Sequence, residues 1–467
     1  MNNLKITFYG GVETVTGSKH LIETPKGYKI LLDCGLFQGK SEKDPNRQFG
    51  FDPRTIDCLI LSHAHIDHCG LIPKLVKEGF RGKIYCTYPT YDLSKIMLED
   101  SARIQELDID YVNKKREKKG LKPILPIYTV EDAIASFDFF YPIGYHEIIP
   151  INNEILLYFT DAGHIIGSAC VNLFYQYQTN EELRISFTGD IGRTVDKILR
   201  SPEKLPNPNV LICESTYGDK IHRPSQDSIL FDIVYETCVK NKGKLIIPAF
   251  SLDRTQEFIY ALDRLKTQGL LPKIPVFVDS PLSIKATFIM KKFSEYFNEE
   301  IKDYMQKTDG DAFHFDNLHY ITDRAESKRI NDMSGPMIII SASGMAEAGP
   351  VKHHIKHAIN NPKNTILFSG HCSQESLGGK LLSGVKEVSI YGDVFKVEAR
   401  IEKIEGYSAH ADKTDLLEFL NQLNQNELKQ IFLVHGETET CEVFQSILIK
   451  KGFQNVIVPK LKQTFFV

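Results

Sequence analysis

Several features are missing from this sequence of 467 residues, and each absence narrows the class of protein. No apolar run reaches the roughly 18 residues of a membrane-spanning helix, so we expect no membrane contact. The first residues lack a basic stretch followed by a long apolar run, so we expect no secretory signal and a cytoplasmic location. Low-complexity segments and Pro- or Ser-rich linkers are also missing, and the globular composition excludes a disordered chain.

Neither net charge nor cysteine content indicates a partner. Lys and Arg number 56 and Asp and Glu number 60, which gives a formal net charge of −4. A polyanionic partner would therefore need a local basic surface. The nine cysteines include no Cys-x-x-Cys pair, which excludes a disulfide framework and a four-cysteine zinc site. We expect free, buried thiols.

The order of apolar runs predicts two kinds of α/β structure in one chain. Residues 1–217 alternate short buried strands with loops rich in Gly and His. Residues 218–405 alternate strands and helices regularly, which predicts a mainly parallel sheet. Residues 406–467 return to the first pattern. We therefore expect one domain made of 1–217 and 406–467, with a second α/β domain inserted at 218–405.

The most informative motif is HAHIDH at 63–68, directly after the apolar run CLIL. Four possible metal ligands lie within six residues, in a strand-end loop where side chains can converge. Imidazole and carboxylate suit Zn²⁺, with Mn²⁺ or Fe as alternatives. His63 and His65 can face one metal, while Asp67 and His68, entering a helix, face a second.

The same arrangement, a polar residue after a buried strand, recurs along the chain. It is found at Asp33, His164, Asp190, Glu214 and His435. Each of these alone is an ordinary polar strand end. Together with the HAHIDH motif they indicate a metal centre.

HAHIDH, the DAGHIIGS segment and the FTGD segment resemble the signature of the metallo-β-lactamase superfamily. The resemblance implies an αββα sandwich with a two-metal site between its sheets. It also implies a ligand set, with His63, His65 and His164 on one zinc, Asp67, His68 and His435 on the other, and Asp190 bridging the two. Asp33 is implied to be a carboxylate that orients a ligand histidine.

Later motifs are similar to those of the β-CASP branch, whose members are nucleases with an inserted α/β domain. Glu214 in CESTYGD, His410 in GYSAHAD and His435 in FLVHGE resemble its three additional motifs. The expected fold class is thus α/β, a metallo-β-lactamase αββα sandwich with an inserted α/β β-CASP domain. A histidine in the third motif goes with RNA substrates in this family. The chain resembles the RNA-processing endonucleases related to the eukaryotic cleavage and polyadenylation nuclease.

This resemblance predicts a zinc-dependent ribonuclease acting on single-stranded RNA. Two metals, Zn²⁺ or alternatively Mn²⁺, would activate a bridging hydroxide that attacks the phosphodiester. His410, held and charged by Glu214, would protonate the leaving 3′ oxygen, with Asp67 as a further catalytic residue. Products would carry 5′-phosphates. Endonuclease and 5′-exonuclease modes both stay open, and a homodimer is suggested only by relatives.

Substrate contacts are expected in the inserted domain. Ser343 and Gly344 in SASGMAEAGP precede a helix, where backbone N–H groups can hold a phosphate. Arg254 and Lys380 are candidate phosphate contacts from their positions in family-like segments. The cationic cluster that follows SASGMAEAGP is interpreted as an exposed helix face, although His353 and His357 have the spacing of a helical metal pair. His371 is expected to be a loop residue.

Three other functions are compatible with parts of this pattern. A small-substrate hydrolase of the same superfamily, such as a thioesterase or lactonase, would not need the inserted block. A DNA nuclease is disfavoured by His435. A catalytically inactive RNA-binding scaffold is disfavoured because every ligand position of the motif set is filled.

Overall fold

The computed structural model describes residues 4–39, 44–178, 181–222, 227–370 and 372–467, so His371 lies outside the described residues. The chain divides into two compact units. Unit 1 comprises Met1–Ile221 and His410–Val467, and unit 2 comprises His222–Ala409. The boundaries expected from the sequence, after residues 217 and 405, each lie four residues before these.

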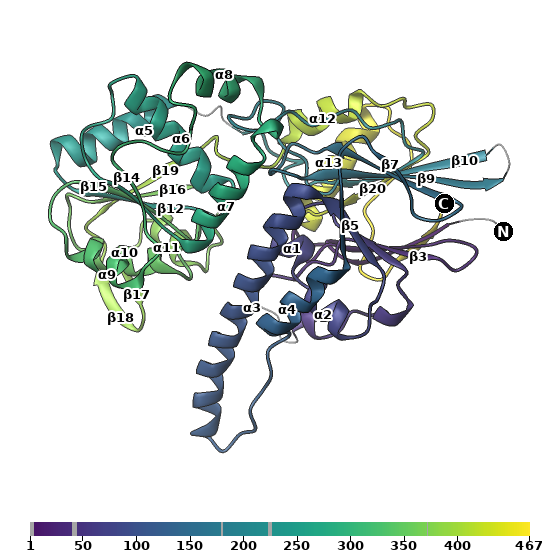
Figure 1. Cartoon of the computed structure of the whole chain (residues 1–467), viewed down its shortest axis with the longest axis horizontal. Coiled ribbons are helices and arrows are strands. Elements are labelled where there is room, and N and C mark those ends of the chain that lie inside the picture. Colours follow the sequence, from purple (N-terminus) through teal and green to yellow (C-terminus); the bar gives the residue numbers. More distant parts are fainter. Residues whose placement is uncertain (1–3, 40–43, 179–180, 223–226, 371) are drawn as a thin grey trace. The chain divides into compact units, whose positions relative to one another are not determined.

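Unit 1 contains two seven-stranded sheets (Figure 1). The first has the order β22 (Thr464–Phe466), β1 (Lys5–Gly10), β2 (Lys19–Glu23), β3 (Lys29–Leu32), β4 (Cys58–Ile60), β5 (Lys83–Thr87) and β6 (Phe140–Ile143). The second has the order β21 (Val456–Ile457), β20 (Gln430–Val434), β11 (Val210–Glu214), β10 (Glu181–Phe187), β9 (Ala169–Gln178), β8 (Ile155–Asp161) and β7 (Ile148–Pro150).

The core of unit 1 lies between these sheets. Alternate residues of each strand enter it, as the two-residue period of a strand requires. On β8 these are Ile155, Leu157 and Phe159, and they meet Ile6 and Phe8 from β1. This layer excludes water from the interior and fixes where each strand ends.

Helices cover the outer faces of both sheets. The first sheet packs against α1 (Ile66–Cys69), α2 (Ile72–Lys77), α3 (Tyr88–Glu117) and α4 (Val130–Ser136). The second packs against α12 (Lys413–Asn421) and α13 (Thr438–Lys450). The layers therefore run helix, sheet, sheet, helix, which confirms the predicted αββα sandwich.

Unit 2 is built on one parallel sheet. Its order is β14 (Leu318–Tyr320), β13 (Val276–Asp279), β15 (Met337–Ser341), β12 (Lys244–Pro248), β16 (Thr365–Ser369) and β19 (Arg400–Ile404). Every neighbouring pair in it is parallel, as the alternation of strands and helices predicted.

Helices flank both faces of this sheet. Figure 1 shows α5 (Asp227–Val234) and α6 (Arg254–Thr267) on one side, and α9 (Arg324–Asp332), α10 (Pro350–Ala358) and α11 (Leu377–Leu382) on the other. The remaining elements include α7 (Pro281–Lys292), α8 (Glu299–Lys307) and the hairpin of β17 (Glu387–Ile390) and β18 (Asp393–Lys396).

All nine cysteines are free, and eight of them are buried, as expected from their spacing. None of the helices in the described part of the chain combines the length and the apolar character needed to cross a membrane.

Candidate metal centre

The polar strand ends of unit 1 converge on one site. Asp33 follows β3, the HAHIDH segment follows β4, and His164 follows β8. The other contributors are Asp190 after β10, Glu214 at the end of β11 and His435 after β20. Strands of both sheets thus deliver their carboxyl ends to a single place, although these residues are separated by up to about 400 positions in sequence.

Two glycines allow these loops to approach one another. A Cβ on Gly35 would lie 1.6 Å from the backbone oxygen of Asp67, and a Cβ on Gly192 would lie 1.8 Å from the backbone oxygen of Gly163. Neither position has room for a side chain. The loop after β3 can therefore pack on α1, and the loop after β10 can pack beside His164.

Backbone strain also marks the site. Asp33 has φ 57° and His435 has φ 51°, in the left-handed region that non-glycine residues rarely occupy. Each residue directly follows the last residue of a strand. Such conformations cost about 1–3 kcal/mol and persist where the surrounding structure enforces them, commonly at functional sites.

A first group of ligand atoms consists of His63 Nε2, His65 Nδ1, His164 Nε2 and Asp190 Oδ2. The Nδ1 atom of His65 lies 3.1 Å from the Nε2 atoms of both His63 and His164. Asp190 Oδ2 lies 3.5 Å from His63 Nε2 and 3.6 Å from His164 Nε2. A tetrahedral zinc with bonds of about 2.0–2.1 Å would hold its ligands about 3.3–3.4 Å apart. The observed spacing brackets that value.

A second group contains Asp67, His68 and His435. The Nε2 atoms of His68 and His435 lie 3.2 Å apart, and His435 Nε2 lies 3.5 Å from Asp67 Oδ2. The other oxygen of Asp190, Oδ1, lies 3.2 Å from His68 Nε2. One carboxylate therefore faces both groups, one oxygen to each.

The donor set fits two metal ions. Asp190 Oδ1 is fully buried and has no hydrogen-bond partner among the described residues, even though an imidazole nitrogen lies 3.2 Å away. A buried carboxylate oxygen without a partner is costly. A cation shared by that oxygen and the surrounding imidazoles would satisfy it.

The protonation of two histidines of the first group also suits a metal. Burial holds the pKa of His63 well below its usual range and lowers the pKa of His65 to about 4. Both rings are thus neutral near pH 7, which is the form that binds metal. Burial alone would raise the pKa of Asp190, but the surrounding imidazoles hold it well below its usual range.

Hydrogen bonds fix which ring nitrogen faces the centre. His68 Nδ1 lies 2.6 Å from Asp33 Oδ2, so the ring donates outward and turns Nε2 inward. The hydroxyl of Ser62 donates to Asp33 at 2.9 Å and lies 3.0 Å from His63 Nδ1. Asp33 thus contacts one ligand ring directly and a second through Ser62.

His435 is held in a similar way by Thr216. The Thr216 hydroxyl donates to the backbone oxygen of His435 at 2.9 Å and lies 3.1 Å from its Nδ1. Neither Ser62 nor Thr216 was identified from the sequence. Ser62 directly precedes His63 and Thr216 follows Glu214 by two residues, but such proximity does not show which way a hydroxyl points.

Glu214 and His410 form a pair beside the first ligand group. His410 Nδ1 lies 3.3 Å from Glu214 Oε1, and its Nε2 lies 3.9 Å from Asp190 Oδ2. Burial disfavours the charged ring, but the Glu214 and Asp190 carboxylates raise the pKa of His410 to about 9. Glu214 is fully buried, whereas the side chain of His410 is 21 % exposed. The ring is therefore a protonated group within reach of a bound molecule.

The candidate substrate contacts lie in unit 2. Ser343 and Gly344 follow β15, and the Ser343 amide donates to the Ala348 oxygen at 3.1 Å. Lys380 is exposed on α11. Arg254 is only 7 % exposed, and its guanidinium pairs with Glu257. Its charge is thus already balanced within α6, and phosphate binding by these residues stays a prediction.

The cationic face of α10 was expected to be exposed, and it is only partly so. His353 and His357 are exposed, but His354 is 1 % exposed because it faces Asp279 inside unit 2. Among the described residues, the groups close enough to share a metal are the two above and a third made of Asp190, Glu214 and His410. His353 and His357 belong to none of them.

Family models match most of the chain. A metallo-β-lactamase superfamily domain matches residues 21–212, a β-CASP domain matches 255–381, and a Zn-dependent metallo-hydrolase RNA specificity domain matches 394–459. The candidate metal ligands before His435 lie in the first of these segments, and His410 and His435 lie in the third.

Individual relatives cover nearly the whole length. The chain is 32 % identical to Ribonuclease TTHA0252 of Thermus thermophilus over 96 % of its own residues and 97 % of that protein. It is 30 % identical to the transcription termination factor FttA of Methanocaldococcus jannaschii, over 98 % of this chain and 70 % of that protein. A crystal structure of an Enterococcus faecalis protein of unknown function covers all of both chains with a TM-score of 0.54 and 11 % identity, which shows a shared fold.

Proposed function

This chain belongs to the β-CASP branch of the metallo-β-lactamase superfamily, and on that premise we propose that it is a two-zinc ribonuclease that cleaves single-stranded RNA. That it is a metal-dependent hydrolase follows from the family. The observation that carries the proposal is the shared carboxylate of Asp190, whose two oxygens face two separate groups of ligand atoms.

The first zinc would be held by His63, His65 and His164, the second by Asp67, His68 and His435, with Asp190 common to both. When bound, the two ions would supply Lewis acidity toward a phosphate oxygen and would lower the pKa of water at the site. Asp33, Ser62 and Thr216 keep the ligand rings in the required orientation.

His410 is the proton donor in this proposal. Glu214 lies against Nδ1 and raises the pKa of the ring, and the side chain of His410 is 21 % exposed. Nε2 would give its proton to the leaving 3′ oxygen of a bound phosphodiester. Protonating that oxygen leaves the phosphate on the 5′ side of the downstream product.

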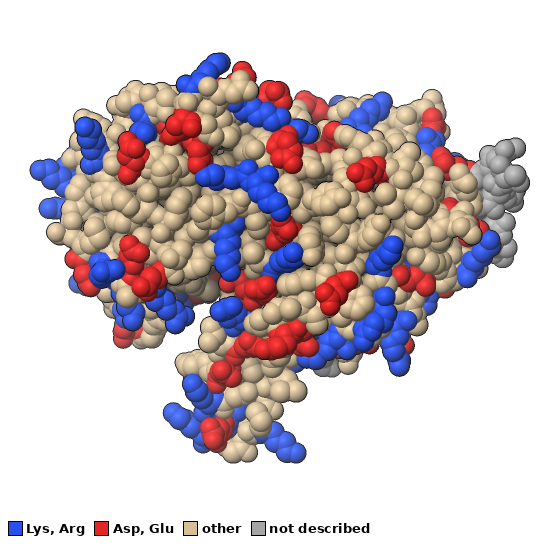
Figure 2. Space-filling model, in the orientation of Figure 1, with Lys and Arg blue, Asp and Glu red and all other residues tan. Residues whose placement is uncertain are grey.

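RNA is favoured over DNA and over small substrates by two points. The segment that contains His410 and His435 matches an RNA specificity domain. The relative that this chain matches over 97 % of that relative's length is named a ribonuclease. On the face shown in Figure 2, basic and acidic side chains are interspersed. Weak, salt-sensitive binding to RNA is expected from such a surface.

The test uses one internally labelled single-stranded RNA and the DNA of the same sequence, each incubated with wild-type protein and with His410→Ala. We expect wild type to cut the RNA to products with 5′-phosphates, and His410→Ala to cut it far more slowly. Products ending in 2′,3′-cyclic phosphates would contradict the mechanism. Failure to cut either strand, in protein shown to hold two metals, would favour a small-substrate hydrolase instead.

A further inference from the structure

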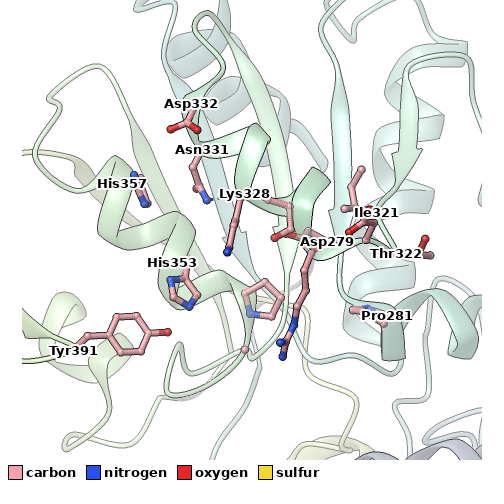
Figure 3. A pocket seen from close by; sticks show the side chains of 15 residues that line it. Asp279, Pro281, Ile321, Thr322, Lys328, Asn331, Asp332, His353, His357 and Tyr391 are labelled. Atoms are coloured by element: carbon pink, nitrogen blue, oxygen red, sulfur yellow. Dashed lines mark hydrogen bonds between the residues drawn. The ribbon is translucent and has the colours of Figure 1, made fainter.

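Unit 2 contains a hollow of about 810 Å³ that the metal centre does not use. Its walls come from residues between 279 and 391, all within unit 2 (Figure 3). The volume falls within the range of about 300–1,000 Å³ that small-molecule sites occupy.

The hollow lies where a parallel α/β sheet ordinarily binds ligands. Several of its lining residues lie at or directly after the carboxyl ends of β13 and β14, and others lie at the end of the loop between β15 and α10. The hollow thus reaches the first residues of α7, α9 and α10. After β12, the chain adds β13 and then β14 toward one edge of the sheet. It then turns back toward the other edge, placing β15 between β13 and β12 and β16 on the far side of β12. Strands β13 and β15 are neighbours whose next helices therefore lie on opposite faces, which opens a crevice between them.

A network of buried polar groups makes the floor rigid. His354 Nε2 lies 2.7 Å from Asp279 Oδ2, and its Nδ1 lies 2.8 Å from Asn331 Oδ1. The Ser327 hydroxyl donates to the same Asp279 oxygen at 2.6 Å. These bonds tie β13, α9 and α10 together, so the walls are held in place before any ligand arrives.

Two cations on α9 line the hollow. Arg324 and Lys328 are one helical turn apart and both line the hollow. Neither forms an ion pair with any residue that the structure describes. Three acids also line the hollow: Asp279 is bonded to His354, Asp323 accepts from the Ala325 amide at the start of α9, and Asp332 lies at the end of that helix.

The opposite wall is aromatic. The rings of His353 and Tyr391 stack with centroids 4.8 Å apart and an angle of 28° between planes. In Figure 3 both side chains and the Lys328 amine extend toward the same hollow. Burial lowers the pKa of His353, and the neighbouring His354, His357 and lysines lower it further.

We propose that this hollow binds a nucleoside 5′-phosphate, with its phosphate between Arg324 and Lys328 and its base against the His353–Tyr391 pair. Paired cations select the phosphate, and the aromatic wall selects a planar base rather than a simple anion. A free nucleotide and a nucleotide unit of an RNA strand present the same chemistry. The inference does not depend on the metal centre, so it stands or falls separately from the proposed ribonuclease activity.

The first experiment measures binding of AMP to the full-length protein by isothermal titration calorimetry. We expect the combined Arg324→Ala and Lys328→Ala substitutions to weaken AMP binding at least about tenfold. Arg329→Ala is the matched control, because Arg329 is exposed on the same helix but does not line the hollow. Adenosine should bind far more weakly than AMP, and inorganic phosphate should compete with AMP.

A second readout reports on the hollow directly. The chain contains no tryptophan, so Tyr391→Trp adds a single indole to the aromatic wall. AMP should change the emission of this indole, and the dissociation constant from fluorescence should equal the one that calorimetry gives for the same Tyr391→Trp variant. Undiminished AMP binding by the double variant, or an indole emission unaffected by AMP, would overturn the proposal.

The trinucleotide pApApA distinguishes the two sources of the ligand. Tighter binding of pApApA than of AMP, with a raised KM and unchanged kcat for RNA cleavage in the double variant, would assign the hollow to the RNA strand. Equal or tighter binding of AMP, with unchanged KM for RNA, would assign it to a free nucleotide.

Discussion

The Nδ1 atom of His410 lies 3.3 Å from the Oε1 atom of Glu214, although 196 positions separate the two residues in sequence. Glu214 is fully buried at the end of a central strand, and its Oε1 also accepts the Ile191 amide at 2.5 Å. The carboxylate is thus held by the backbone, and it in turn holds a histidine that is partly exposed. This relationship places a histidine with a raised pKa beside the candidate ligand groups.

The first prediction concerns this donor. His410→Ala should lower kcat for RNA cleavage by about 10²–10⁴-fold, the usual contribution of a positioned acid. Glu214→Gln should act in the same direction but less strongly, because the ring remains and loses only its charge partner. Both rates are measured under single-turnover conditions with wild-type metal content confirmed.

A modified substrate separates proton donation from a structural role. In an RNA analogue with sulfur in place of the leaving 3′ oxygen, the leaving group needs no proton. His410→Ala should then lose most of its defect relative to wild type. An equally large defect on both substrates would show that His410 does not act as the acid.

The second prediction concerns Asp190. Asp190→Asn removes one negative charge shared by both ligand groups, so the protein should hold less than half of the wild-type metal content after dialysis. Mass spectrometry of the dialysed protein measures the metal. Asp138→Asn, at an exposed aspartate, is the control and should retain the wild-type content. Loss of only one metal in Asp190→Asn would mean that Asp190 does not bridge.

The third prediction tests Ser62 as a positioning residue. Ser62→Ala leaves His63 Nδ1 without its oxygen partner, and metal affinity should fall about 10–100-fold. Ser136→Ala makes the same change at another buried serine, which donates only to the Ala133 oxygen in α4. That control should lose about 1 kcal/mol of stability and no metal affinity. Equal metal affinity in the two variants would remove Ser62 from the centre.

The αββα sandwich was predicted from the resemblance of the motifs to a known superfamily, whereas the strand ends and the parallel sheet were predictable because their signals are local. The HAHIDH segment and the polar residues after β3, β8, β10 and β20 each follow a short apolar run, and a strand ends wherever such a run ends. The alternation of strands and helices after residue 218 likewise depends on neighbouring residues, and it predicted the parallel sheet of unit 2.

Other features depend on distances that no local pattern encodes. The roles of Ser62 and Thr216 follow from which oxygen lies 3.0–3.1 Å from a ring nitrogen. The burial of His354 follows from its contact with Asp279, which lies 75 residues earlier. Arg254 carries the same sequence signal as a phosphate ligand, yet its charge is balanced by Glu257 inside α6.

The last prediction concerns pH and the stability of the fold. Burial raises the pKa of Asp161, at the end of β8, to about 7 from an ordinary value of 3.8, and the Gly163 amide that donates to it at 2.9 Å only partly offsets this. Between these two values the folded chain keeps the proton while the unfolded chain has lost it. The unfolded state therefore binds fewer protons, and the free energy of unfolding falls as pH rises from about 4 to about 7.

Asp161→Asn should remove this loss, because an amide accepts the Gly163 hydrogen bond without a charge. The free energy of unfolding of the variant relative to wild type should rise by at most about 3 kcal/mol from about pH 5 to about pH 8, and the difference in Tm should become more positive accordingly. Thermal unfolding of both proteins at matched ionic strength measures it, with Asp138→Asn as an exposed control. A Tm difference independent of pH would show that Asp161 is charged in the folded protein near neutrality, and that its burial is compensated by groups other than the Gly163 amide.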